Sequence, residues 1–185
     1  LSSVTAIASC FKNSGQFNQP VPFDTASVTA WSAMFRKAAA FDQPLLFDMG
    51  RALGIAGLFR DAAAFGQPVP FDVSGVTSMY GVFESTRRFN HPVLFDTSSV
   101  VTMNAMFYDA TAFNQPVAFD VSSVTTMSVI FDGADALSAC NMRLIARSLG
   151  TNSAWPPDWS AYSCFPPADA PQLQAALTAW NAGQG

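Results

Sequence analysis

The feature that most constrains this chain is a 24-residue repeat, which runs without insertion or deletion from residue 4 to residue 137. Sixteen of the 17 phenylalanines lie in three columns with this spacing, and a proline and an aspartate column keep the same step. These five columns begin at Phe11, Phe17, Phe23, Pro20 and Asp24. Chance does not produce such a register, so the chain is a repeat protein.

Six copies of the repeat begin at Val4, Val28, Ala52, Val76, Val100 and Val124, the last one incomplete. Counted from these residues as position 1, a copy reads Val-Thr-x-Met-x-x-Met-Phe-x-x-Ala-x-x-Phe-Asn-Gln-Pro-Val-x-Phe-Asp-x-Ser-Ser. A period of 24 residues lies within the range of leucine-rich-type coils, roughly 20–29, and is too short for two antiparallel helices. We therefore expect residues 1–137 to form a leucine-rich-repeat-like solenoid of six coils.

Each coil is predicted to contain short strands and one helical turn. Val-x-Phe-Asp alternates with the two-residue period of a strand after the Gln-Pro corner. Positions 4, 7 and 8 (Met103, Met106 and Phe107 in the fifth copy) fall at helical spacing and predict the helical turn. Asp-x-Ser-Ser predicts a turn in which the Asp carboxylate accepts a backbone N–H two residues on.

The repeat ends at Leu137, and residues 138–185 are predicted to form a mostly helical C-terminal cap with a short tail. Helices are expected over 139–149, with Gly150 as the C-terminal cap, and over 168–181. Cys140 and Cys164 bracket a Trp- and Pro-rich segment outside the repeat columns, so we predict a disulfide between them. Closing that loop contributes about 3 kcal/mol in the chain-entropy model.

The phrase Phe-Asn-Gln-Pro-Val-x-Phe-Asp-x-Ser-Ser-Val-Thr-x-Met-x-x-Met-Phe, clearest over 89–107 and 113–131, resembles the BspA-like bacterial surface-protein repeat. The resemblance covers residues 4–137. The segment from Cys140 to Cys164 also looks like the ending of members from marine unicellular algae. It implies a leucine-rich-like solenoid associated with cell surfaces, adhesion and protein binding, and it brings no catalytic residues. The sequence departs from the pattern at the start of the third copy, where Met49-Gly50-Arg51-Ala52-Leu53-Gly54-Ile55 loses the Ser-Val-Thr signature and keeps its apolar spacing. Gly66 replaces an Asn in the third copy, and His91 replaces a Gln in the fourth.

Composition excludes several function classes. A net charge of -4 and a pI near 4.6 argue against a nucleic-acid binder, and no apolar run approaches the roughly 18 residues of a membrane span. The lone histidine, His91, lies in a column of glutamines and is interpreted as a polar corner residue. With no catalytic motif in the chain, we expect no enzyme activity and no catalytic, metal or cofactor site. The Asp column is interpreted as turn caps and Cys10 as a buried free thiol.

One outward-facing set of side chains is unexpectedly apolar. Position 19 lies between inward Val and Phe residues and should therefore point outward, and position 22 is also apolar in part. A strand with one wet face normally alternates apolar and polar residues. Either the C-terminal tail or a flanking loop covers this face, or a protein partner or neighbouring subunit does. The candidate partner surface consists of Pro22, Leu46, Pro70, Leu94, Ala118, Met49, Val73 and Val121.

Charge changes sign along the repeats. Early copies carry Lys12, Arg36, Lys37, Arg60, Arg87 and Arg88 in one arc, and later copies carry Asp109, Asp132 and Asp135 in the same arc. This order either orients a partner or marks an ordinary solvated edge. Leu1 stands just after the Asp position, so the chain starts in mid-repeat. We expect residues 1–24 to be covered by a preceding segment or a partner subunit.

These observations together predict a non-catalytic protein-binding or scaffold module. The alternatives are a structural subunit of a large multi-protein assembly, including one in an organelle lumen, and a cell-surface adhesion or carbohydrate-binding protein. A hydrolase is the weakest alternative, because there is no second histidine and no cluster of acids. The cysteine pair favours an oxidising compartment, which means the secretory pathway, the cell surface or an organelle lumen.

Overall fold

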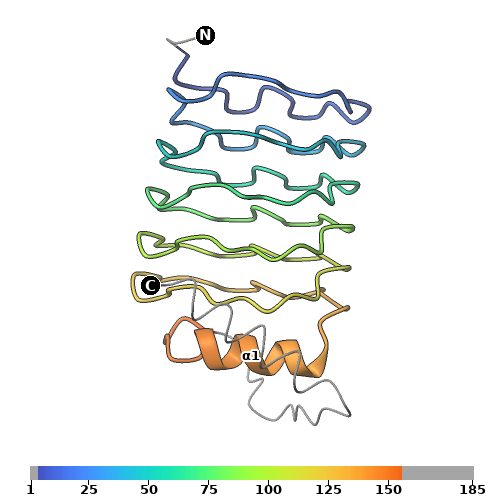
Figure 1. Ribbon diagram of the computed structural model, residues 1–185. Coiled ribbons are helices and arrows are strands. Elements are labelled where there is room, and N and C mark those ends of the chain that lie inside the picture. The colour runs from blue at the N-terminus through green and yellow to red at the C-terminus, as the bar shows by residue number, and fades with distance from the viewer. Residues whose placement is uncertain (1–3, 156–185) are drawn as a thin grey trace.

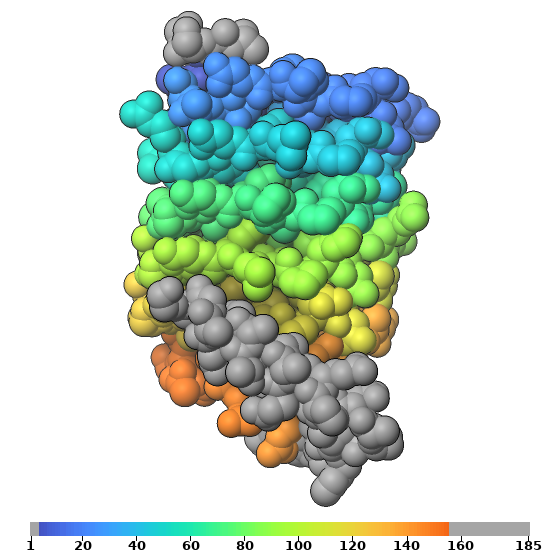
Figure 2. Space-filling view, viewed as in Figure 1, coloured from blue at the N-terminus to red at the C-terminus, as the bar shows by residue number. Residues whose placement is uncertain are grey.

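The computed structural model describes residues 4–155 as flattened coils that lie directly on one another, with one helix below the last coil (Figure 1). Successive coils are 24 residues apart, as the repeat predicts. Parallel bridges join Ala6 to Ala30, Ala30 to Gly54, Ser78 to Thr102 and Thr102 to Thr126. The only helix or strand assigned within residues 4–155 is α1 (Ala139–Leu149). In the space-filling view each coil forms a band packed against the next (Figure 2).

Backbone hydrogen bonds fix the register between coils along positions 2–13. The N–H at positions 6, 8 and 10 donates to the carbonyl at positions 5, 7 and 9 of the next coil. In the first coil these bonds run from Ser9 to Ser32 (3.0 Å), Phe11 to Met34 (2.9 Å) and Asn13 to Arg36 (2.8 Å). The bonds recur in later coils, so side chains with the same position number are stacked in columns along the molecule.

The predicted helical turn is wrong: positions 6 to 13 form consecutive tight turns. Position 6 and position 10 have positive φ in every copy, for example Ala33 at 59° and Lys37 at 62°. A helix would use its N–H groups locally, whereas here alternate N–H groups bond to the next coil and the others bond three residues back, as Lys12 does to Ser9 (3.1 Å). The side chains of positions 4, 7 and 8 still point inward, and Met103, Met106 and Phe107 are fully buried.

Phenylalanine rings fill the space between the two long sides of each coil. Ring centroids in the first column are 5.3 to 5.9 Å apart from coil to coil, with planes nearly parallel. Within a coil, the rings at positions 8 and 14 lie closer still, at 4.0 Å for Phe59 and Phe65. Trp31 is fully buried against Phe47 and donates its indole N–H to the Val28 carbonyl. These contacts form one continuous apolar core.

A ladder of side-chain oxygens holds the Asn-Gln-Pro corner. The Asn18 side-chain oxygen accepts the Asp42 N–H (2.9 Å) and the Asp42 carboxylate accepts the Gly66 N–H (3.0 Å). The glutamine that follows reaches the same oxygen, as Gln67 does to Asp42 (2.9 Å). Gly66 has no side-chain oxygen, so a glutamine at residue 91 would find only the Gly66 backbone carbonyl, which corresponds to the longer of the two bonds that Gln67 makes to Asp42 (3.3 Å). The loss of the better acceptor at Gly66 is consistent with the loss of the glutamine at His91.

Helix α1 packs on the last coil and matches its predicted bounds. Ser138 is the N-cap and accepts the Asn141 N–H, and Gly150 ends the helix with its N–H donating to the Ala146 carbonyl (2.8 Å). Ile145 and Leu149 are buried in the shared core. After the helix, Asn152 donates to the carbonyls of Val121 and Val124 (2.6 and 2.9 Å), which ties the chain to the last Asp turn.

The first coil is less buried than those below it. Phe11 and Phe17 are half-buried and Phe23 is 38% exposed, whereas Phe35 and Phe41 are inaccessible. Cys10 is exposed, so the expectation of a buried thiol is wrong. The other members of its column are buried between two coils or, for Ile130, between a coil and α1. The expectation that a segment or a partner covers this coil stays a prediction.

Three predictions lie wholly or partly outside the described residues. The helix over 168–181 is one. Cys140 is the second residue of α1, but Cys164 falls beyond residue 155, so their disulfide stays a prediction. The extent of the cap over 138–185 likewise stays a prediction beyond α1.

Candidate binding surface

The position 19 side chains point outward along one long side of the stack. Leu46 is 93% exposed and Leu94 is 77% exposed, while their neighbours Leu45 and Val93 are 3% exposed. This is the alternation that the Val-x-Phe pattern predicts. Pro22, Pro70 and Ala118 are exposed in the same column.

A second apolar column, which the sequence pattern was not interpreted to expose, runs beside the first. The position 17 prolines are exposed as well, two residues before position 19 and on the same face. Between the third and fourth coils this face is hollowed, with an open space of about 440 Å³ lined by Pro68, Pro70, Pro92 and Leu94 among others. We call the two columns the apolar stripe; its residues are Pro20, Pro44, Pro68, Pro92, Pro116, Pro22, Leu46, Pro70, Leu94 and Ala118.

Position 22 does not belong to this surface, which corrects the prediction. Met49 and Val73 are each 1% exposed and Val121 is 6% exposed. The two-residue alternation continues through the exposed aspartate at position 21, so the residue after it points into the core. Thr25 and Thr97, in the same column, are buried too.

Aspartates form a negative edge along the stripe. In each turn the Asp carboxylate accepts the N–H two residues on, as Asp96 does from Ser98 (3.0 Å) and Asp120 from Ser122 (2.9 Å). Hydrogen bonds from Ser122 hold the pKa of Asp120 below its ordinary value, and those from Ser74 do the same for Asp72. The carboxylates of Asp72 and Asp120 are therefore ionised at neutral pH, and all five aspartates of the column are exposed. We call this column the acidic edge: Asp24, Asp48, Asp72, Asp96 and Asp120.

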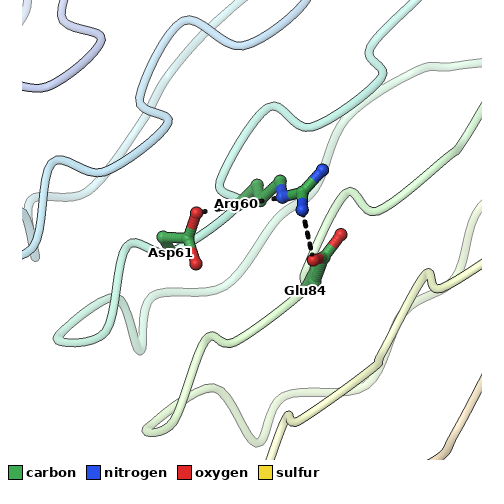
Figure 3. Close-up of polar contacts among 3 residues, drawn as sticks. All are labelled: Arg60, Asp61 and Glu84. Atoms are coloured by element: carbon green, nitrogen blue, oxygen red, sulfur yellow. Dashed lines mark ion pairs between the residues drawn. The ribbon is translucent and has the colours of Figure 1, made fainter.

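The opposite long side carries the charges of positions 9 and 10. Arg60 and Glu84 occupy position 9 of the third and fourth coils and form an ion pair of 2.7 Å, with Asp61 3.8 Å from the Arg60 Nε (Figure 3). Burial raises the pKa of Glu84, and the Arg60 charge opposes that rise. A second ion pair joins Arg87 to Asp109 at 3.1 Å. We call this side, at positions 9 to 13, the charged face.

Residues 4–155 contain no metal-binding cluster and no membrane-spanning helix. Within that range no three His, Cys, Asp or Glu side chains come together in a way that could hold a metal ion. The His91 ring lies 6.2 Å from the Phe89 ring and is partly exposed at the corner. No helix in the described part of the chain is long and apolar enough to cross a membrane.

The fold and its surfaces define a repeat protein of stacked 24-residue coils with one apolar and one charged long side. A family model described as "Mycoplasma protein of unknown function, DUF285" matches residues 1–70 and 55–143. The chain belongs to this family. No curated protein and no solved structure matches the chain.

Proposed function

We propose that this protein is a non-catalytic binding or scaffold module, a leucine-rich-repeat-like solenoid of the BspA-like kind, and that it binds another protein through the apolar stripe. The observation that carries this proposal is the exposure of Leu46 (93%) and Leu94 (77%) in a column that contains no polar residue over five coils. Single exposed leucines are ordinary on soluble proteins, whereas contiguous apolar surface marks interaction sites.

The backbone behind the stripe supports a preformed surface. The inward neighbours on either side of position 19 are buried, as Val69 (5%) and Phe71 (6%) are around Pro70. Proline at positions 17 and 19 fixes φ and removes N–H groups that would otherwise need partners. A surface with so little freedom loses little conformational entropy when it binds, so more of the contact energy appears as affinity.

Charge indicates the chemistry of the partner. The acidic edge runs beside the whole stripe, and Arg51 is the one basic Lys or Arg on this side of the described coils. A matching partner surface is apolar with basic groups along one border. A structural subunit of a large assembly would use the same surface to contact its neighbouring subunit. The number of copies of this chain in the purified complex distinguishes a structural subunit from a binding or scaffold module.

The compartment is part of the proposal. If Cys140 and Cys164 pair, the protein works in an oxidising space such as the secretory pathway, the cell surface or an organelle lumen.

Site-specific photocrosslinking tests the proposal. A photoreactive residue is placed at position 46 or 94, with position 53 as the control, because Leu53 is 64% exposed on the other long side. In native extract, positions 46 and 94 should capture the same partner protein, and position 53 should not. The variant Leu46→Ser/Leu94→Ser should lose that partner while its unfolding transition stays unchanged, because both side chains are exposed. Equal capture at all three positions, or none at 46 and 94, contradicts the proposal.

A further inference from the structure

At positions 9 and 10 the charged face has a charge order that changes sign along the stack, whereas Arg87 and Arg88 lie outside these two columns, at positions 12 and 13 of coil 4. Coils 1 and 2 carry Lys12, Arg36 and Lys37 and no carboxylate at positions 9 and 10. Coils 5 and 6 carry Asp109 and Asp132 at these positions and no cation. The change falls between coils 3 and 4, at the pair formed by Arg60 and Glu84 (Figure 3).

These charges lie in a straight array because hydrogen bonds hold positions 9 and 10 in columns. The N–H at position 10 donates to the carbonyl at position 9 of the next coil throughout: Asn13 to Arg36, Lys37 to Arg60, Asp61 to Glu84, Ser85 to Tyr108 and Asp109 to Asp132, all at 2.7 to 2.8 Å. Lys12 and Asp132 are therefore at opposite ends of one column. Both are exposed, and neither forms an ion pair within residues 4–155.

An array of this kind is complementary to itself. Consider a twofold axis that is perpendicular to the stack, parallel to the backbone of the coils, and level with the gap between coils 3 and 4. This axis reverses the order of the coils in the second copy. It leaves each repeat position opposite the same position of the second copy. It places Lys12 opposite Asp132 of the second copy and Lys37 opposite its Asp109. Arg36 then meets Tyr108 of the second copy, a residue 41% exposed whose ring suits a guanidinium group. Every such contact occurs twice, as in any isologous interface.

Exposed apolar side chains occupy positions 2 and 5 of the middle coils, beside the columns of the charged face. Leu53 in coil 3 is 64% exposed, Tyr80 in coil 4 is 41% exposed and Val101 in coil 5 is 44% exposed. They replace the small or hydroxyl residues that the same positions have in the first two coils, such as Thr5 and Ala8. An apolar centre with charges toward the ends has the anatomy of a protein interface.

We propose that the charged faces of two copies of this chain associate in an antiparallel homodimer, with coils 1 and 2 of one copy against coils 5 and 6 of the other. This contact uses the long side opposite the apolar stripe, so the dimer leaves both stripes open. It stands independently of the proposed function of that stripe.

Charge exchange between copies tests the dimer, with the full chain followed by sedimentation velocity over a range of concentration and salt. The wild-type chain should dimerise, more weakly as salt rises. Lys12→Asp alone and Asp132→Lys alone should each weaken the dimer about tenfold, because a contact that occurs twice turns from attraction to repulsion. An equimolar mixture of the two variants should dimerise again, because each reversed residue then faces an opposite charge.

The matched control is Arg51→Asp, which makes the same charge change as Lys12→Asp on the other long side, where Arg51 is exposed. It should leave the dimer unchanged. A wild-type chain that stays monomeric overturns the proposal, as does a dimer weakened equally by Arg51→Asp. A mixture of the two variants that dimerises no better than either alone also overturns it. Far-UV circular dichroism of each variant shows that the coils are intact, since all three positions are exposed.

Discussion

Phe65→Ala removes one ring from the middle of the aromatic core. Phe65 is inaccessible to solvent, and its ring centroid lies 4.0 Å from Phe59 and 6.1 Å from both Phe41 and Phe89. A phenylalanine buried on all sides loses its transfer free energy and leaves a cavity that the coils above and below cannot both fill. The expected loss in the free energy of unfolding is about 3–5 kcal/mol.

The matched variant is Phe17→Ala, in the same column of the first coil. The Phe17 ring contacts Phe11 at 4.2 Å and Phe41 at 5.8 Å, but it is only half-buried and has no described ring above it. With neighbours on one side only, its removal opens the site to water and leaves no closed cavity. We expect a loss of about 1–2 kcal/mol, in proportion to the smaller burial.

Urea unfolding followed by circular dichroism measures both losses. The midpoint should fall much further for Phe65→Ala than for Phe17→Ala, with similar slopes, because nearly the same surface is exposed on unfolding. Equal losses in the two variants would refute the reasoning, because they would show that the rings do not depend on coils stacked on both sides.

Three further predictions follow from the backbone, the acidic edge and the cap. Gly57→Ala should cost about 1–2 kcal/mol in unfolding experiments, because φ is +62° there, while Gly54→Ala, with ordinary φ and room for a methyl group, should cost less than half as much. NMR titration should show that the pKa of Asp120 lies below its ordinary value, and Ser122→Ala should raise that pKa. Because the pKa of Asp120 is lower in the folded chain than in the unfolded chain, ionised Asp120 stabilises the fold. That contribution is fully present above the unfolded pKa and is lost as the pH falls through the folded pKa. Thiol titration of the denatured, unreduced chain should find one reactive thiol, that of Cys10, and three would rule out the pairing of Cys140 with Cys164.

The sequence predicted what depends on period and alternation. The 24-residue step placed Phe35, Phe59 and Phe83 in one column, and the Val-x-Phe pattern placed Leu46 and Leu94 on the surface. Both follow from spacing alone, because identical copies in register must stack identical residues. The bounds of α1 also followed from local signals, namely the spacing of Met142, Ile145 and Leu149 and the glycine after them.

What the sequence could not predict depends on contacts between coils. Positions 4, 7 and 8 fit both a helix and the observed turns, and the choice is made by hydrogen bonds to a coil 23 residues away. Met49 and Val73 are a different case, because the two-residue alternation continues through the exposed aspartate and already places them inward, so the prediction that they face outward misapplied the pattern. Cys10 is exposed because burial in its column depends on neighbours on both sides, which are coils or, for Ile130 in the last coil, a coil and α1.

The position 17 prolines were a missed part of the stripe, although a signal for them was present. They precede position 19 by two residues, so the alternation that turned Leu46 outward also turns Pro44 outward. They were interpreted only as corner residues, because proline is an expected breaker of strand ladders.

The central claim, that the apolar stripe is a binding surface on a stack of coils, is tested most directly by carbene footprinting of adjacent residues. In the purified chain, Leu46 and Leu94 should label strongly while Leu45, which is 3% exposed, stays unlabelled. In native extract, labelling of Leu46 and Leu94 should fall several-fold, in step with each other, because a partner covers both. Equal labelling of Leu45 and Leu46 would contradict the fold, and unchanged labelling of Leu46 and Leu94 in the extract would contradict the binding surface.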